Sequence, residues 1–175
     1  MAWVTLSVGS NTRPCENFCS CLDMLLLQFR DLALSSVYES RGDHHQSIYY
    51  LNMAVGFETG LPLADLALLL KKIEDKHHRA RTPEPGAEVT IDLDLLTYDD
   101  KAGTFNGVVL PHPDIITKAY VLKPLLQIAG KRQHPVLKKT YSELGKDLLA
   151  RFEQAGQQLR PVAFEWHGRV LSKPE

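Results

Sequence analysis

The sequence predicts an α+β fold, an antiparallel or mixed β-sheet covered by helices. Hydrophobic alternation with a period of two, typical of strands, runs over residues 3–8, 50–59 and 89–96. Apolar stripes with the period of a helix lie between and after these segments. Because strands and helices interleave without a regular strand–helix–strand series, the pattern favours this class over a parallel sheet.

Composition fits one globular domain spanning residues 1–175. The chain is 44% hydrophobic and 23% charged with a net charge of −1, so nothing directs it to nucleic acid or to a membrane surface. It has neither an apolar run long enough to span a membrane nor the pattern of a secretory signal. Cys15, Cys19 and Cys21 are odd in number and crowded, which favours free thiols in a reducing cytoplasm.

The first half of the chain is expected to alternate strand and helix. Gly9, Ser10 and Asn11 end the first strand, because these residues favour turns and helix caps. The apolar stripe of the next helix consists of Phe18, Leu22, Leu25, Leu26 and Phe29. Residues 34–38 are a short strand candidate, and the polar residues 39–47 predict a loop.

The strand at residues 50–59 has two distinct faces. Its inward side chains are expected to be Leu51, Met53, Val55 and Phe57. The opposite face begins with Tyr50 and Asn52. A second helix, residues 63–76, carries three lysines near its C-terminal end, where cations are favourable: Lys71, Lys72 and Lys76.

Residues 89–96 carry the strongest chemical signal. Their alternation places Asp92 and Asp94 on the same face of a strand, roughly 6–7 Å apart along it. Like charges side by side within an apolar segment are costly unless cations offset them. A divalent metal fits, because Mg²⁺ binds one or two carboxylates together with phosphate oxygens and water. The alternative is a solvated edge strand with two surface aspartates.

A basic cluster lies directly upstream of the aspartate pair. Its members are Lys71, Lys76, Arg79 and Arg81. Basic groups for phosphate beside acids for metal are the two halves of a nucleotide-triphosphate site. The sequence contains no P-loop lysine motif and no Gly-x-Gly-x-x-Gly, so phosphoryl transfer here would not use a P-loop. The alternative is a solvated basic helix end.

The second half of the chain predicts helices and then a short β-structure. Residues 116–129 favour one helix, or two short ones broken at Pro124. Thr140 and Glu143 form a capping box that begins another helix. The tail at residues 161–171 favours a strand or hairpin.

Over roughly residues 1–130 the chain carries a series of motifs in a characteristic order. They are Val8-Gly9-Ser10-Asn11, Tyr50-Leu51-Asn52, Ile73-Glu74, Arg79-x-Arg81, Ile91-Asp92-Leu93-Asp94-Leu95, Leu110-Pro111-His112-Pro113 and Leu125-x-x-Ile128-Ala129. With them the chain resembles the 6-hydroxymethyl-7,8-dihydropterin pyrophosphokinases of folate biosynthesis. The resemblance implies a ferredoxin-like sheet with helices on both faces. It implies a pyrophosphokinase-like core at residues 1–130 and a C-terminal extension at 135–175.

The resemblance also implies a reaction and a role for individual residues. The reaction is transfer of pyrophosphate from ATP to the hydroxymethyl group of the reduced pterin, giving AMP. Asp92 and Asp94 would hold two Mg²⁺ ions and, with Arg79 and Arg81, would be catalytic. The residues implied to contact ATP are Lys71, Arg79, Arg81, His112 and Lys118. Those implied to bind the pterin are Gly9, Tyr50, Asn52 and Tyr120.

The chain departs from the family pattern just before the aspartate strand. Where the family usually has Arg-Trp-Gly-Pro-Arg-Thr, this chain has Pro85-Gly86-Ala87-Glu88-Val89-Thr90. The tryptophan is therefore replaced by Gly86, and the arginine nearest the strand by Val89. Three interpretations stay open: an active pyrophosphokinase, slow or shifted in substrate; a diverged paralogue that binds pterin or nucleotide with little or no turnover; and a non-enzymatic ferredoxin-like ligand-binding module.

Overall fold

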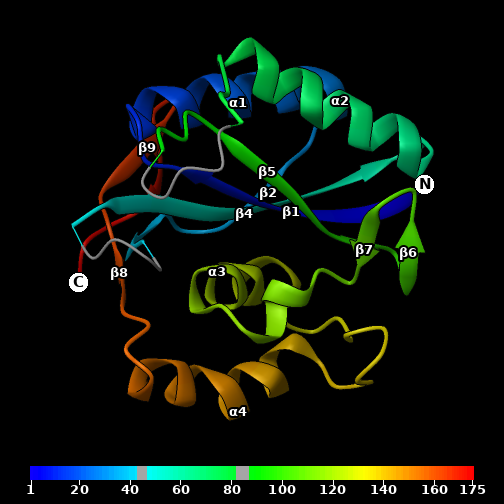
Figure 1. Cartoon of the computed structure of the whole chain (residues 1–175), viewed down its shortest axis with the longest axis vertical. Coiled ribbons are helices and arrows are strands. Elements are labelled where there is room, and N and C mark those ends of the chain that lie inside the picture. Colours follow the sequence, from blue (N-terminus) through cyan, green and yellow to red (C-terminus); the bar gives the residue numbers. More distant parts are fainter. Residues whose placement is uncertain (43–46, 82–86) are drawn as a thin grey trace.

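The computed structural model describes residues 1–42, 47–81 and 87–175 (Figure 1). In chain order the elements are β1 (Ala2–Ser10), α1 (Pro14–Phe29), β2 (Ala33–Leu34), β3 (Tyr38–Arg41), β4 (Tyr49–Thr59), α2 (Leu63–Lys76), β5 (Asp92–Tyr98), β6 (Gly103–Phe105), β7 (Val108–Leu110), the 3₁₀ turn η1 (Pro113–Ile116), α3 (Ala119–Ala129), α4 (Tyr141–Gln154), β8 (Leu159–Pro161), β9 (Phe164–Trp166) and β10 (Arg169–Ser172).

One antiparallel sheet organises the molecule. Its strand order is β5-β1-β4-β3-β8, and β2 pairs with the other end of β4. The succession β1, α1, β3, β4, α2, β5 with this order is the split β-α-β arrangement of ferredoxin-like folds. Helices α1 and α2 cover one face, and α3 lies on the other with α4 behind it (Figure 1). The predicted fold class is therefore confirmed.

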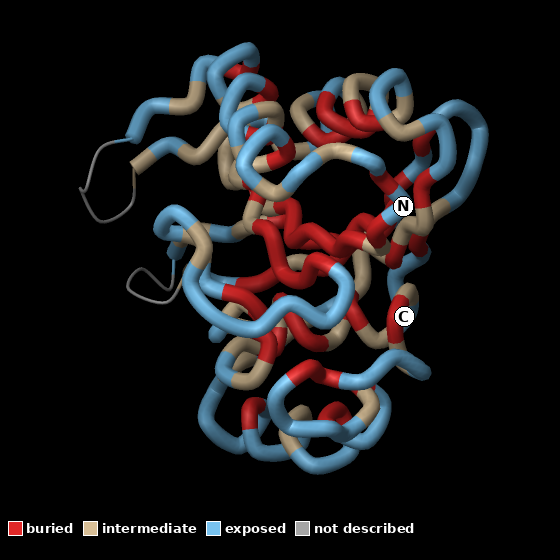
Figure 2. The backbone as a smooth tube through the Cα atoms, turned by 90° about the vertical axis from the view of Figure 1, so that its right-hand side faces the viewer, coloured by how far each residue is buried: buried red, intermediate tan, exposed pale blue. Residues whose placement is uncertain are grey.

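A hydrophobic core lies on each face of the sheet. The larger core joins α1 and α2 to the sheet, and its buried side chains include Val4, Leu6, Val8, Phe18, Leu22, Leu66 and Ile73. The smaller core joins α3 and α4 to β5 and includes Leu96, Ile115, Leu122, Leu125, Leu144 and Phe152. Figure 2 shows the buried segments running through the sheet and the inner sides of the helices. Strand β5 contributes to both cores, since Leu93 and Leu95 belong to the larger core and Leu96 to the smaller one.

Most predicted elements form, with one informative difference in the segment predicted as a loop. Helix α2 occupies the predicted residues 63–76, and α3 continues through Pro124 as one helix. The prediction of a loop over residues 39–47 is wrong in part, because β3 extends to Arg41. Strand β3 is paired on both sides, by β4 and by β8. The partner strand β8 comes from the distant C-terminal region, which a local hydrophobic pattern cannot reveal.

Two further predictions can be compared with the described residues. All three cysteines are free, with Cys15 exposed and Cys21 buried. The capping box is present, since Thr140 accepts from the Glu143 N–H at 3.1 Å and Glu143 accepts from the Thr140 N–H at 2.7 Å. Within the described ranges, none of the helices combines the length and the apolar character needed to cross a membrane.

Helix α4 approaches α3 closely at Gly145. A Cβ atom at this position would lie 2.6 Å from Cδ1 of Leu126. We expect Gly145→Val to lower the free energy of unfolding by about 1–3 kcal/mol, the usual cost of overpacking. Helix propensity alone would favour the variant, because Val forms helices slightly better than Gly.

Urea unfolding measures this difference. The matched control is Lys146→Val, which places the same side chain at the exposed neighbouring position. Equal stability losses in the two variants would show that the contact between Gly145 and Leu126 does not limit the packing of α4.

Candidate functional site

Three residues far apart in the sequence meet in one row across the sheet. Gly9 of β1 lies opposite Asn52 of β4 on one side and opposite Asp92 of β5 on the other. Residues directly opposite each other in adjacent strands direct their side chains to the same face. Because β5 directs Leu96 from this face into the core of α3 and α4, the row faces α3. The strand spacing places the backbones of Asp92 and Asn52 about 10 Å apart.

Gly9 keeps the middle of this row free of a side chain. A Cβ atom on Gly9 would lie 3.5 Å from Oδ1 of Asn52. The amide oxygen is therefore directed toward the space above Gly9, between the amide and the carboxylate. The amide nitrogen is hydrogen-bonded, because Nδ2 of Asn52 donates to Oγ of Ser40 at 2.7 Å. Both Asn52 and Ser40 are buried, so this bond fixes the amide's orientation.

Asp92 and Asp94 carry negative charge that the protein compensates only in part. Burial raises the pKa of Asp92, and the carboxylates of Asp94 and Glu74 raise it further. Burial also raises the pKa of Asp94, with Glu74 and Asp114 adding to the effect. The guanidinium of Arg79 lowers both pKa values. This excess of acid favours a cation at the site. The part of the chain described here holds no cluster of three potential metal ligands.

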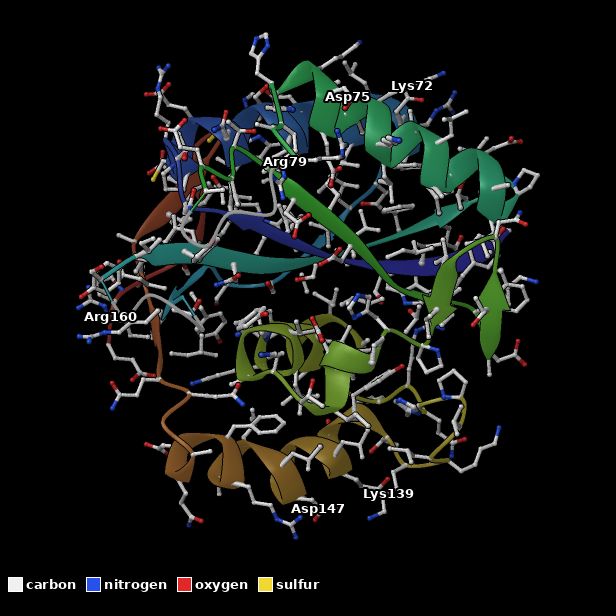
Figure 3. All side chains as sticks on the ribbon, viewed as in Figure 1. Lys72, Asp75, Arg79, Lys139, Asp147 and Arg160 are labelled. Carbon is white, nitrogen blue, oxygen red and sulfur yellow. The ribbon has the colours of Figure 1, made fainter. Side chains whose placement is uncertain are left out.

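Glu74 is a residue of this site to which the sequence analysis assigned no role. It extends from α2 to β5, where Oε1 accepts from the N–H of Leu93 at 3.0 Å. Its other oxygen accepts from Nη2 of Arg81 at 2.8 Å, and Nη1 of Arg81 donates to Asp75 at 2.6 Å. Arg81 is thus paired with the end of α2, while Arg79 lies beside β5 (Figure 3). The Ile73-Glu74 motif was the available signal for Glu74.

The turn after β1 fixes the chain that leads into β5. The N–H of Asn11 donates to the carbonyl of Val89 at 2.9 Å, and Oδ1 of Asn11 accepts from the N–H of Val89 at 2.6 Å. Ser10 Oγ donates to the same carbonyl at 3.2 Å. Strand β5 therefore begins at Asp92 rather than at the predicted residue 89, because the backbone of Val89 pairs with the turn. Gly86 lies outside the described residues.

The other predicted contacts are placed around the row. His112 lies beside β5, since its N–H donates to the carbonyl of Leu96 at 2.8 Å. Lys118 precedes α3 and Tyr120 lies in its first turn, both half-buried. Tyr120 and Ser40 line a common cavity of about 390 Å³. Lys71 is exposed on α2, in the helix layer on the opposite face of the sheet.

The model of the 7,8-dihydro-6-hydroxymethylpterin-pyrophosphokinase family matches residues 5–130. A 2-amino-4-hydroxy-6-hydroxymethyldihydropteridine pyrophosphokinase of Aquifex aeolicus is 30% identical over 146 residues, which cover 82% of this chain and 90% of that protein. The folic acid synthesis protein fol1 of Pneumocystis carinii is 32% identical over 139 residues, 76% of this chain but only 18% of that protein. Plasmodium falciparum HPPK-DHPS with pteroate shares the fold, with a TM-score of 0.67 and 13% identity over 98% of this chain and 49% of that chain.

We expect Asp94→Asn to stabilise the metal-free protein at pH 8. Burial and neighbouring carboxylates raise the pKa of Asp94 to about 6, above its ordinary value of about 3.9. Between about pH 4 and 6 the folded protein therefore binds more protons than the unfolded chain, so its stability falls as the pH rises through this window. Asparagine carries no charge and escapes this loss, which predicts a gain of about 1–2 kcal/mol at pH 8 and almost none at pH 4.

Urea unfolding with a chelator at both pH values measures this effect. Asp100→Asn is the matched control, because Asp100 is an exposed aspartate just beyond β5. A destabilised Asp94→Asn protein at pH 8 would mean that the carboxylate has a structural partner.

Proposed function

The chain belongs to the 7,8-dihydro-6-hydroxymethylpterin-pyrophosphokinase family, and on this premise we propose that it transfers pyrophosphate from ATP to the hydroxymethyl group of 6-hydroxymethyl-7,8-dihydropterin. The hydroxymethyl oxygen bonds to the β-phosphorus of ATP and loses its proton. The bond from that phosphorus to the oxygen of the α-phosphate breaks, and AMP leaves. The row of Asp92, Gly9 and Asn52 is the observation that carries this proposal, because it places an acidic group and an amide on opposite sides of an open position.

Asp92 and Asp94 would hold Mg²⁺ together with the triphosphate. They fit this role because their partly buried negative charge needs a cation, and two carboxylates leave room for phosphate oxygens and water. The metal, two ions in our proposal, would neutralise the phosphate charge when ATP is bound. Because two carboxylates alone make a weak site, we expect metal and nucleotide to bind together.

The basic residues would contact the nucleotide from both sides of β5. The positive charge of Arg79 lowers the pKa of both aspartates, and its side chain would also contact the phosphates. Arg81 would have to exchange its pairing with Glu74 and Asp75 for phosphate oxygens. Beyond these two arginines, the proposed nucleotide contacts are Lys71, His112 and Lys118. With Asp92 and Asp94, the arginines would orient the β-phosphorus toward the hydroxyl group.

Asn52 would recognise the pterin through its amide oxygen. Ser40 occupies Nδ2, which leaves Oδ1 over Gly9 as an acceptor for the N–H groups of the heterocycle. Tyr50 lies on the same face, opposite Ser40, and Tyr120 enters from α3. Two aromatic side chains can stack on the flat ring system, while the amide selects its orientation.

The decisive test of this function is AMP formation from ATP in the presence of Mg²⁺ and 6-hydroxymethyl-7,8-dihydropterin. We expect AMP and the pterin diphosphate in equal amounts, with no AMP when either Mg²⁺ or the pterin is omitted. Mg²⁺-dependent ATP binding without turnover would support the diverged paralogue instead. If neither AMP formation nor Mg²⁺-dependent ATP binding were detected, the result would support a non-enzymatic ligand-binding module.

We expect Asn52→Ala to weaken pterin binding roughly tenfold or more, because the loss of a buried hydrogen-bond partner costs about 1–3 kcal/mol. ATP affinity should change little, since Asn52 lies on the side of Gly9 away from Asp92. Fluorescence titration of the pterin in the presence of a non-hydrolysable ATP analogue measures the effect. The control is Glu58→Ala at an exposed position of the same strand. If Asn52→Ala lowered the affinity for pterin and for ATP equally, the assignment of Asn52 to the pterin pocket would be wrong.

The altered segment before β5 predicts slow turnover with ordinary pterin affinity. Charged groups that act mainly in the transition state change kcat more than ground-state binding, and losing one costs on the order of 10²–10³ in rate. Replacing Gly86 by Trp and Val89 by Arg should therefore raise kcat with little change in the pterin Kd. The pairing of Val89 with Asn11 uses backbone atoms of Val89, so the substitution preserves it.

Steady-state AMP formation and pterin titration separate the two effects. The single variants serve as controls, because each restores one family residue alone. An unchanged kcat in the double variant would contradict the prediction, and Lys71 and Lys76 would then be the first residues to test as replacements for the lost charged groups.

A further inference from the structure

Gln157 connects the C-terminal region to the beginning of α3. Its Oε1 accepts from the N–H of Ala119 at 2.8 Å, and its Nε2 donates to the carbonyl of Thr117 at 2.9 Å. These two backbone groups flank Lys118, and Tyr120 follows directly. The side-chain amide of Gln157 therefore fixes the backbone on both sides of Lys118, the proposed nucleotide contact, and just before Tyr120, the proposed pterin contact.

The end of α4 fixes the backbone of Gln157 itself. Gly156 follows the helix with a left-handed φ of 89°. The N–H of Gly156 donates to the carbonyl of Glu153 at 3.0 Å, and the N–H of Gln157 donates to that of Phe152 at 2.9 Å. This pair of bonds is a Schellman motif, which ends a helix in one defined geometry. Because Phe152 is buried in the core shared with α3, the position of Gln157 is tied to the packing of α4.

The beginning of α3 needs a hydrogen-bond acceptor from elsewhere. The first backbone N–H groups of a helix have no partner within it. The residue at the N-cap is Lys118, whose ammonium group is a donor only, and its side chain makes no capping bond. Gln157 supplies the acceptor for Ala119 and, with the same amide, the donor for Thr117. Among side chains of this length, only an amide offers both at once at neutral pH.

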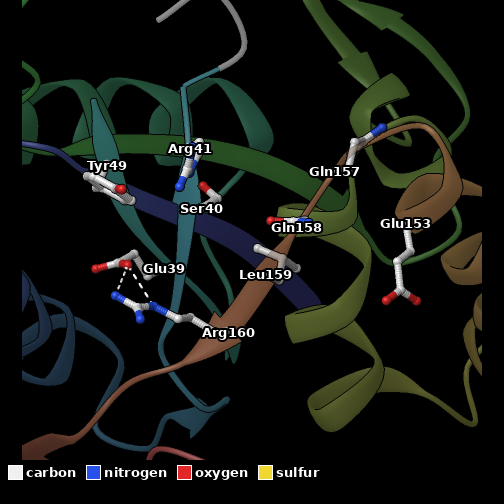
Figure 4. A pocket seen from close by; sticks show the side chains of 9 residues that line it. All are labelled: Glu39, Ser40, Arg41, Tyr49, Glu153, Gln157, Gln158, Leu159 and Arg160. Atoms are coloured by element: carbon white, nitrogen blue, oxygen red, sulfur yellow. Dashed lines mark hydrogen bonds and ion pairs between the residues drawn. The ribbon is translucent and has the colours of Figure 1, made fainter. Parts of the chain in front are cut away.

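Gln157 also lies against the cavity beside the pterin position. It lines the cavity of about 390 Å³ that Ser40 and Tyr120 share, and a second one of about 420 Å³ that extends toward Tyr49 and Arg160. Figure 4 shows Gln157 and Gln158 on the segment that leads from α4 to β8. The family match ends at residue 130, so this contact comes from the part of the chain beyond it.

We propose that Gln157 is a positioning residue that holds the segment from Thr117 to Tyr120 so that Tyr120 stacks on the pterin and Lys118 contacts the nucleotide. This inference rests on the proposed pyrophosphoryl transfer. It assigns a role in substrate binding to the C-terminal region, through backbone atoms rather than through direct contact with either substrate.

The test compares Gln157→Ala and Gln157→Glu with the wild-type protein in AMP formation. We expect Gln157→Ala to raise KM for the pterin at least about fivefold, consistent with the loss of two hydrogen bonds, with a smaller change in kcat. In Gln157→Glu the carboxylate can accept from Ala119 but faces the carbonyl of Thr117 without a proton. Its KM should therefore move toward the wild-type value measured at the same pH as the pH falls to about 5 and below, where a growing fraction of the carboxyl group is protonated and can donate.

Gln158→Ala is the matched control, because Gln158 is exposed and lines the same two cavities. Hydrogen exchange at the Ala119 amide gives a readout that does not depend on activity, and it should accelerate in Gln157→Ala alone. A KM equal to that of the wild type in Gln157→Ala, or a Gln157→Glu defect that does not vary with pH, would overturn the inference while the proposed function stands. Absence of AMP formation by the wild-type protein would refute the proposed function and this inference with it.

Discussion

The register of β1 between β4 and β5 is the constraint on which the site depends. A shift of either pairing by one residue would send every side chain of that strand to the opposite face. The apolar residues Val4, Leu6 and Val8 prevent such a shift, because they are fully buried under α1 and α2. With this register fixed, Gly9 lies between Asn52 and Asp92. The larger core therefore determines the geometry of a site that lies on the other side of the sheet.

The two sides of the site differ in their effect on stability. A hydrogen bond orients the amide on β4, whereas the buried charges on β5 destabilise the folded protein. On the β4 side, the bond from Asn52 to Ser40 satisfies half of a buried amide and leaves its oxygen available. On the β5 side, neighbouring carboxylates add to the cost of ionising Asp92 and Asp94 that burial already imposes. Such an arrangement is more costly without ligand than with a bound cation. Groups that lower stability in this way are common at functional sites.

Sequence reasoning found the parts of the site that a local pattern can encode. Alternation within one strand was enough to pair Asp92 with Asp94 and to place Asn52 on the face opposite Leu51 and Met53. It could not find Ser40, because the strand that contains it pairs with distant β8 and has a polar sequence. Nor could it assign Gln157, whose partners are backbone groups of residues 117 and 119. Contacts between a side chain and a distant backbone leave no periodic signal.

The layer of α3 and α4 connects the C-terminal region to the face of the sheet that carries the proposed site. Helix α3 lies between the sheet and α4 (Figure 1), so in the proposed function α4 would act on the site through α3 rather than by direct contact. Gly145 lets α4 approach the side of α3 near Leu126, and the Schellman motif after α4 directs Gln157 to the beginning of the same helix. Two separate contacts along α3 therefore limit its freedom to shift along its own axis. Since Lys118 directly precedes α3 and Tyr120 lies in its first turn, their positions depend on packing outside the family-matched core.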